Sequence, residues 1–238
     1  MVYADDALLV INKPAGLVVH PGAGNPDHTL VNGLLAECPE LEALPRAGLV
    51  HRIDKDTSGL LLVARQPQSF QQLVRLLARR QISRYYETVV TGLLIAGGSI
   101  DQPIGRDPRH RTRMRVVAGG RQAVTHYRVL ERFRAHCLLG VELETGRTHQ
   151  IRVHLAHAGH PLVGDHRYGA RPRPPRGASQ ALLEILGQFP RQALHAAQLS
   201  FEHPISGESL VFEAPRPADF EALVQALAAD LAAADSSE

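Results

Sequence analysis

Apolar and polar residues alternate or cluster in short segments along this chain, which predicts many strands and a few helices. Alternation with period two, or a short apolar run bounded by Gly, Pro, Asn or Asp, is typical of a strand. The predicted strands are 8–12, 17–20, 48–50, 60–64, 85–92, 112–117, 124–132, 136–144, 193–201 and 209–213.

Apolar residues that recur at helical spacing predict the remaining elements. Thr29 can cap the first of these helices, and the second has an apolar face between Phe70 and Leu77 with arginines on its outer side. The predicted helices are 30–38, 68–80, 148–157 and 219–231. Consecutive strands joined by short turns favour an α+β fold, with a mainly antiparallel central sheet and helices packed on it.

Length and composition are those of an ordinary soluble globular protein. The 238 residues, 44% of them hydrophobic, fit one large domain or two tightly joined halves. We expect the folded domain to span 1–231 and the acidic tail 232–238 to be disordered. No apolar run approaches the ~20 residues of a membrane span. The first residues lack the pattern of a signal peptide. With only Cys38 and Cys137, we expect a reducing cytoplasm as the location.

Charge is distributed unevenly, although the net charge is only +2. Residues 208–238 hold seven acids and one base, so the rest of the chain carries +8. The densest basic segment, 106–121, has six arginines and one acid, and a second basic segment with three prolines spans 169–177. Such a stripe is typical of a surface that binds a phosphate backbone. It is also compatible with a solvated strand face in a chain where 24 of 26 basic residues are Arg.

The segment 48–65 places Asp54 in a turn rich in charge, between two apolar runs. A carboxylate near cations stays ionised at neutral pH, which suits a nucleophile or an electrostatic stabiliser. A turn rich in Asp, Thr, Ser and Gly is equally expected where such side chains cap their own backbone without any function. The charge pattern alone leaves both interpretations open.

Two further motifs carry polar and aromatic side chains. Arg84-Tyr85-Tyr86-Glu87 begins a predicted strand. The segment 144–154 gathers Thr, Arg, His and Gln at a predicted helix N-terminus, where N–H groups favour anions.

Together these motifs resemble the RluA/RluD-type pseudouridine synthases, which modify large-subunit ribosomal RNA. The run 51–59 is similar to the catalytic-aspartate motif of that family, 85–87 to its tyrosine motif and 146–152 to its basic motif. Further similarity covers 12–14, 19–22, 161–165, 194–196 and 203–204, so it extends over roughly residues 3–230 in order. The basic loop 169–175 is most similar to the RluD branch.

The resemblance implies a pseudouridine synthase catalytic fold with an active-site cleft, and a role for each matched residue. Asp54 would be the catalytic aspartate, and Tyr86 would stack on the target uracil and could take the C5 proton. Arg152 would pair with Asp54, and Arg52 would help to displace the target nucleotide. Whether Asp54 attacks the sugar, attacks the base or abstracts a sugar proton stays open. The residues expected to contact RNA are His51, Arg52, Lys55, Arg106, Arg109, Arg111, Arg113, Arg147, Thr148, His149 and Gln150.

The resemblance also implies a partner and the absence of a cofactor. Moving the glycosidic bond from N1 to C5 requires no redox change, group donor or metal, so we expect neither cofactor nor metal. The expected partner is large-subunit rRNA or its assembly precursor, with no membrane contact, and we expect a monomer. RluD-type enzymes usually carry an N-terminal S4-type RNA-binding domain, which this chain lacks.

Each residue also has an interpretation without catalysis. Tyr86 is also expected as an ordinary strand aromatic, and Arg152 as a surface ion-pair partner. The histidines at 149, 154, 157 and 160 match no zinc pattern. Two rival functions are an RNA-binding module without turnover and a glycosidase-type hydrolase that uses Asp54 with Asp56.

Overall fold

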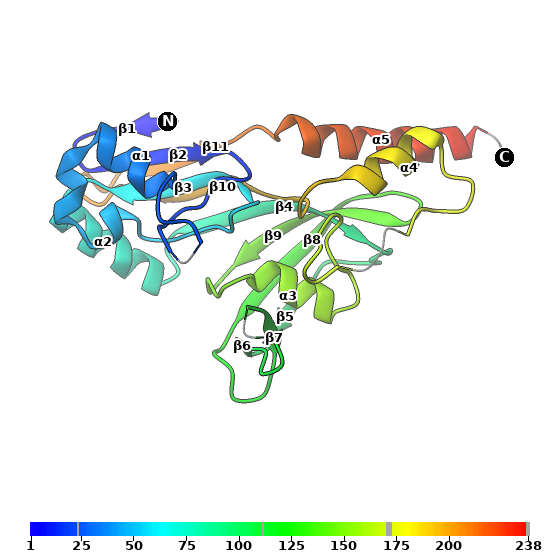
Figure 1. Cartoon of the computed structure of the whole chain (residues 1–238), viewed down its shortest axis with the longest axis horizontal. Helices are drawn as coiled ribbons and strands as arrows, with labels where there is room; N and C mark the ends of the chain where they lie inside the picture. The colour runs from blue at the N-terminus through cyan, green and yellow to red at the C-terminus, as the bar shows by residue number, and fades with distance from the viewer. Residues whose placement is uncertain (23, 111, 170–172, 237–238) are drawn as a thin grey trace. The chain divides into compact units, whose positions relative to one another are not determined.

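The computed structural model describes residues 1–22, 24–110, 112–169 and 173–236 and divides them into two compact units (Figure 1). Unit 1 comprises Met1–Tyr85 and Ala196–Pro215, and unit 2 comprises Tyr86–His195 and Arg216–Glu238. The chain passes from one unit to the other within two strands, β4 (Ser83–Thr91) and β10 (Leu194–Glu202).

Unit 1 is a sheet in the strand order β1-β2-β3-β10, with β11 paired to β10. The pairs β1–β2, β2–β3 and β10–β11 are antiparallel. Every residue of β3 is buried, as expected for a strand covered on both faces. The remaining elements of this unit are β1 (Tyr3–Ala4), β2 (Leu8–Lys13), β3 (Ser58–Ala64), β11 (Ser209–Glu213), α1 (Leu30–Glu37), α2 (Pro67–Ala78) and the 3₁₀ helices η1 (Pro39–Ala43) and η2 (Pro45–Gly48).

Unit 1 is held together by an apolar core and by defined helix starts. The core includes Leu8 and Val10 of β2, Leu60 and Leu62 of β3, and Leu73 of α2. Thr29 caps α1 as the sequence predicts: its Oγ1 accepts the N–H of Asn32, and the Asn32 side chain accepts the N–H of Thr29.

Unit 2 has the strand order β4-β9-β8-β5, and β5–β8 and β8–β9 are antiparallel. A separate hairpin, β6–β7, carries much of the basic segment. The remaining elements are β5 (Gly98–Asp101), β6 (Ile104–Arg106), β7 (Met114–Val116), β8 (Val124–Arg132), β9 (His136–Leu143), α3 (Gln150–His157), α4 (Gln180–Gln188) and α5 (Ala218–Asp235). These pairings confirm the predicted α+β fold with a mainly antiparallel sheet.

Two apolar clusters organise unit 2. The larger joins α4 and α5, which lie side by side in Figure 1, to the sheet through residues such as Leu182, Phe220 and Val89. The smaller joins Ile104 of β6 to Val153 of α3, so the hairpin is anchored to the helix that carries Arg152.

Several predicted elements differ from the structure. Residues 17–20 form no strand, because the carbonyls of Pro14 and Leu17 turn toward the ammonium group of Lys13. The predicted hairpin around Asp54 is also wrong. Residues 45–48 form η2, Arg46 and Ala47 have positive φ, and only the bridge Leu49–Val63 joins this segment to β3.

Other boundaries shift or were not predicted. Helix α3 begins at Gln150 instead of Thr148, because His149 adopts the left-handed conformation at φ 57°. Helix α5 continues through Asp235, so the predicted disorder of 232–238 is wrong for residues 232–235. Residues 237–238 lie outside the described residues. The sequence analysis missed β1, β5, β6, η1 and α4.

Gly59 joins the Asp54 segment to β3 at a position that excludes a side chain. Its φ is +109°, and a Cβ built there would lie 2.2 Å from the carbonyl oxygen of Ala196. We expect Gly59→Ala to lower the free energy of unfolding by about 2–3 kcal/mol, measured by urea denaturation. Gly33→Ala is the matched control, because Gly33 lies in α1 with open space around it. It should raise stability by about 0.5–1 kcal/mol. Equal effects of the two substitutions would contradict the packing argument.

Candidate active site

Asp54 lies in the segment 49–57, between η2 and β3. Its side chain is half-buried, whereas the neighbouring Ile53 is buried and Lys55 is exposed. Its carbonyl accepts the N–H of Thr57 at 3.1 Å, which closes the turn that leads into β3. The carboxylate therefore lies at the boundary between the core of unit 1 and solvent.

Lys13 fixes the backbone beside Asp54. Its side chain has no exposed surface, and its Nζ donates to the carbonyls of Pro14 at 2.7 Å, Leu17 at 2.9 Å and Lys55 at 2.8 Å. The Lys55 carbonyl also accepts the N–H of Gly16 at 3.0 Å. An ammonium group has three N–H donors, so these carbonyls match its full donor capacity. One buried cation thus holds the 13–17 turn and the Asp54 segment together.

His51 is a neutral hydrogen-bond acceptor in the interior of unit 1. Its Nε2 accepts the N–H of Leu62 at 3.1 Å, and its buried Nδ1 has no hydrogen-bond partner among the described residues. Burial, with a smaller contribution from the charge of Arg84, lowers the pKa of His51 to about 3. An uncharged imidazole offers no charge to a phosphate, so this feature gives no support to its predicted contact with RNA.

Positive charge gathers on the outer side of the same segment. Arg52 is exposed, and it lies close enough to His20 to affect that group. Burial, followed by the charges of Arg52 and Arg46, lowers the pKa of His20. The surface around Asp54 is thus electropositive, as a polyanionic substrate would require.

Arg152 and Asp165 form a buried ion pair in unit 2. Arg152, on α3, is 7% exposed and Asp165 is 4% exposed. Nε and Nη2 of Arg152 donate to the two carboxylate oxygens of Asp165 at 2.7 and 2.9 Å. This two-bond geometry fixes the plane of the guanidinium group.

Aromatic and backbone groups complete the surroundings of this pair. The Tyr168 ring lies 5.1 Å from Cζ of Arg152. The Tyr168 hydroxyl accepts the N–H of Met114 at 2.9 Å and hydrogen-bonds Nδ1 of His149 at 2.7 Å. Burial opposes ionisation of Asp165, but the hydrogen bonds and charge of Arg152 outweigh it and lower the pKa of Asp165. The pair is therefore ionised at neutral pH.

The β6–β7 hairpin presents the predicted basic stripe. Arg106 and Arg109 are exposed and Arg113 is half-buried, whereas Arg111 lies outside the described residues. The only acid in the stripe, Asp107, accepts the N–H of Arg109 at 2.9 Å, and this bond contributes most to lowering the pKa of Asp107. The hairpin therefore offers several cations around one carboxylate that is already hydrogen-bonded.

The basic motif 147–150 divides into exposed and internal residues. Burial and the charge of Arg121 lower the pKa of Arg147, so two like charges lie close together there. Thr148 is exposed. Gln150 is buried and accepts from Thr145 Oγ1 and the Arg147 N–H, while its amide donates to Val124 O and Thr125 Oγ1. These bonds use its donors and both lone pairs, which gives the predicted RNA contact of Gln150 no support.

The three predicted catalytic residues are distributed over the two units. Asp54 belongs to unit 1, whereas Tyr86 and Arg152 belong to unit 2. Tyr86 is 5% exposed and lies on β4, the strand in which the chain passes between the units. Each residue is held by regular structure or by an internal hydrogen-bond network close to it.

The sequence analysis missed Lys13, Asp165 and Tyr168 as supporting residues. The segments 12–14 and 161–165 carried a signal, since both were similar to the family without an assigned role. Tyr168 lay outside every quoted motif, and its contacts with Arg152 and His149 depend on tertiary structure.

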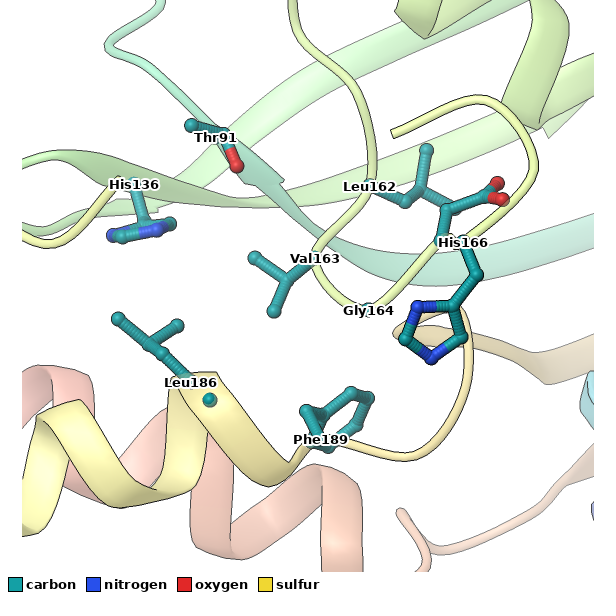
Figure 2. Close-up of a pocket in the computed structure, with 10 residues that line it drawn as sticks. Thr91, His136, Leu162, Val163, Gly164, His166, Leu186 and Phe189 are labelled. Atoms are coloured by element: carbon teal, nitrogen blue, oxygen red, sulfur yellow. The ribbon is translucent and has the colours of Figure 1, made fainter. Parts of the chain in front are cut away.

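Figure 2 shows a pocket in unit 2 with one wall formed by the loop that carries Asp165. It encloses about 100 Å³, and its apolar walls include Leu162, Leu186 and Phe189. Its polar lining includes His136, whose pKa is lowered by burial and whose buried Nδ1 has no hydrogen-bond partner among the described residues. Of the predicted site residues, none lines this pocket.

Two searches of the described residues gave negative results. None of the helices there is long and apolar enough to cross a membrane. The same part of the chain has no group of three or more His, Cys, Asp or Glu side chains arranged to hold a metal ion.

Comparison with known proteins gives consistent matches. The family model described as RNA pseudouridylate synthase matches residues 7–157. Ribosomal large subunit pseudouridine synthase D of Haemophilus ducreyi is 53% identical over 230 residues, which cover 97% of this chain and 71% of that protein. The protein of the same name from Escherichia coli K12 is 54% identical over the same shares.

Two solved human structures are also similar. RNA pseudouridylate synthase domain containing 4 has a TM-score of 0.73 and 27% identity, covering 95% of this chain and 92% of that one. RNA pseudouridylate synthase domain containing 1 has a TM-score of 0.68 and 25% identity, covering 96% and 94%. The match in fold therefore extends over nearly the whole of each chain.

Removal of the Lys13 ammonium group should destabilise the Asp54 segment. We expect Lys13→Met to lower the free energy of unfolding by about 3–5 kcal/mol, because three carbonyls lose a buried cationic donor. Urea denaturation measures the change. Lys55→Met is the control, because the Lys55 side chain is exposed, and it should change stability by less than about 0.5 kcal/mol. A Lys13→Met protein as stable as Lys55→Met would contradict this role.

Proposed function

The chain belongs to the RNA pseudouridylate synthase family, and on that premise we propose that it isomerises specific uridines to pseudouridine in large-subunit (23S) ribosomal RNA. The observation that carries this proposal is 53–54% identity, over 97% of the chain, to relatives named ribosomal large subunit pseudouridine synthase D. The half-buried Asp54, held beside the Lys13 clamp, supplies the carboxylate that the reaction needs.

Asp54 is proposed as the catalytic carboxylate. Isomerisation breaks N1–C1′, turns the base, forms C5–C1′ and releases the proton from C5. Charge builds up on the sugar as the first bond breaks, and a fixed carboxylate can stabilise it electrostatically or covalently. The rigid backbone at Lys55 supports this role, because a group held in place needs no reorganisation during the reaction.

Tyr86 and Arg152 are proposed as its partners across the reacting nucleotide. Tyr86 would stack on the uracil and take the C5 proton, and Arg152 would hold the Asp54 carboxylate by hydrogen bonds. The uridine must leave its stack before Asp54 can reach it. Arg52, exposed beside Asp54, would help to displace it and fill the gap.

The remaining basic residues are proposed to bind the RNA backbone. They are Lys55, Arg106, Arg109, Arg111, Arg113, Arg147, Thr148 and His149. The exposure of Arg106 and Arg109 and the closeness of Arg147 to Arg121 support this proposal, because phosphates would relieve repulsion among these cations. We further propose that the protein acts as a monomer in the cytoplasm, where its ribosomal substrate or the assembly precursor is present.

Asp54→Asn should abolish pseudouridine formation and leave RNA binding within about threefold of the unchanged protein, because the amide keeps the shape and loses the charge. Product is measured by mapping pseudouridine in 23S rRNA transcripts, and binding by filter retention. Asp56→Asn is the control and should stay active. A hydrolase that uses both carboxylates would instead lose activity in both variants, and a binding module would give no product with any of them.

Removal of three cations from the hairpin should weaken RNA binding and flatten its salt dependence. For Arg106, Arg109 and Arg113 changed together to Gln, we expect the slope of log K against log salt to fall in magnitude by up to about 2. Arg75, Arg79 and Arg80, changed together to Gln on the outer side of α2, remove the same charge elsewhere. An equal loss of slope in both triple variants would show that net charge, and not the hairpin, determines binding.

A further inference from the structure

Asp165 contacts Arg152 directly, and neither the family resemblance nor the proposed roles gives it a function. We infer that Asp165 is a positioning residue for the reaction: it holds the Arg152 guanidinium in one orientation and balances its charge, so that Arg152 reaches the catalytic carboxylate as a fixed donor. This inference rests on the proposed function of Asp54 and Arg152.

The geometry restricts Arg152 on one edge and on one face. Asp165 takes the edge formed by Nε and Nη2, with distances of 2.7 and 2.9 Å. Tyr168 lies against the guanidinium at 5.1 Å from Cζ. The Nη1 group is on the other edge of the planar fork, outside the contact with Asp165. The orientation of Nη1 is therefore determined by the two contacts.

Asp165 is itself held by the backbone that follows it. Its Oδ1 accepts the N–H of Arg167 at 2.9 Å and that of Tyr168 at 3.0 Å, in addition to the bond from Arg152. Its carbonyl accepts the N–H of Gly169 at 2.7 Å, and a Cβ on Gly169 would lie 2.3 Å from that oxygen. The carboxylate is therefore a rigid support, because several independent bonds determine its position.

Charge balance gives the pair its second effect. Asp165 stays ionised because its pKa is lowered, so the buried Arg152–Asp165 unit has no net charge. An isolated arginine would lower the pKa and the nucleophilicity of a carboxylate beside it. A charge-balanced guanidinium still donates directional hydrogen bonds but withdraws less of that reactivity.

The alternative is an ion pair that only joins α3 to the 162–169 loop. A matched pair elsewhere in unit 2 separates the two interpretations. Arg191 and Asp219 form the same two-bond contact, with Nε–Oδ2 at 2.7 Å and Nη2–Oδ1 at 2.9 Å, away from Arg152. Loss of Asp219 should therefore remove comparable bonds without changing the orientation of Arg152.

The experiment compares Asp165→Asn with Asp219→Asn in the whole chain, using a 23S rRNA transcript as substrate. We expect Asp165→Asn to lower kcat by about 10–100-fold, with KM within about threefold, because a misplaced donor affects the chemical step. Asp219→Asn should keep kcat within about twofold, and Asp165→Glu, which retains the charge, should lie between Asp165→Asn and the unchanged protein. Thermal unfolding of each variant reports its stability separately.

A double-variant cycle with Arg152→Met tests whether Asp165 acts through Arg152. Adding Asp165→Asn to Arg152→Met should change kcat by less than about twofold, because the group that it positions is gone. Multiplied losses would overturn the inference, and so would an Asp165→Asn protein with unchanged kcat. If Asp165→Asn does not fold, Asp165→Glu decides, and an unchanged kcat there also overturns it. Lack of product with the unchanged chain would instead refute the proposed function itself.

Discussion

The arrangement around Asp54 depends on the burial of one ammonium group. Transfer of a charge into a protein interior is strongly unfavourable unless hydrogen bonds replace the lost water. Lys13 meets that requirement with three backbone carbonyls, which come from two segments about 40 residues apart in sequence. Because the requirement is strict, the two segments cannot separate without exposing a buried cation. The position of the Asp54 backbone is thus a consequence of the solvation of Lys13.

The second unit uses the opposite arrangement for a related purpose. There a cationic side chain is the presented group, and a buried carboxylate and an aromatic ring restrain it. In both units, the residue that the chemistry needs is held by a neighbour that is itself saturated with hydrogen bonds. Such preorganisation is the main way in which a protein without a bound cofactor can stabilise a developing charge.

The sequence predicts the elements whose signal is local. Strand β8 has the predicted bounds, α1 has the predicted Thr29 cap, and the apolar run of β3 is recognisable. The errors at 17–20 and 48–50 have long-range causes, since the Lys13 ammonium turns the first segment and left-handed residues at 46 and 47 bend the second. Likewise, Asp54 could be predicted from its motif, whereas the support that Asp165 gives to Arg152 required the tertiary structure.

The burial of Lys13 also has a consequence for chemical labelling. Lys13 and Lys55 are the only lysines in the chain, and the first has no exposed surface whereas the second is exposed. An amine-selective acylating reagent therefore has one lysine to modify in the folded protein and two after the Asp54 segment opens. The ratio of modification at these two sites reports local opening of the segment, with the exposed lysine as an internal standard in every sample.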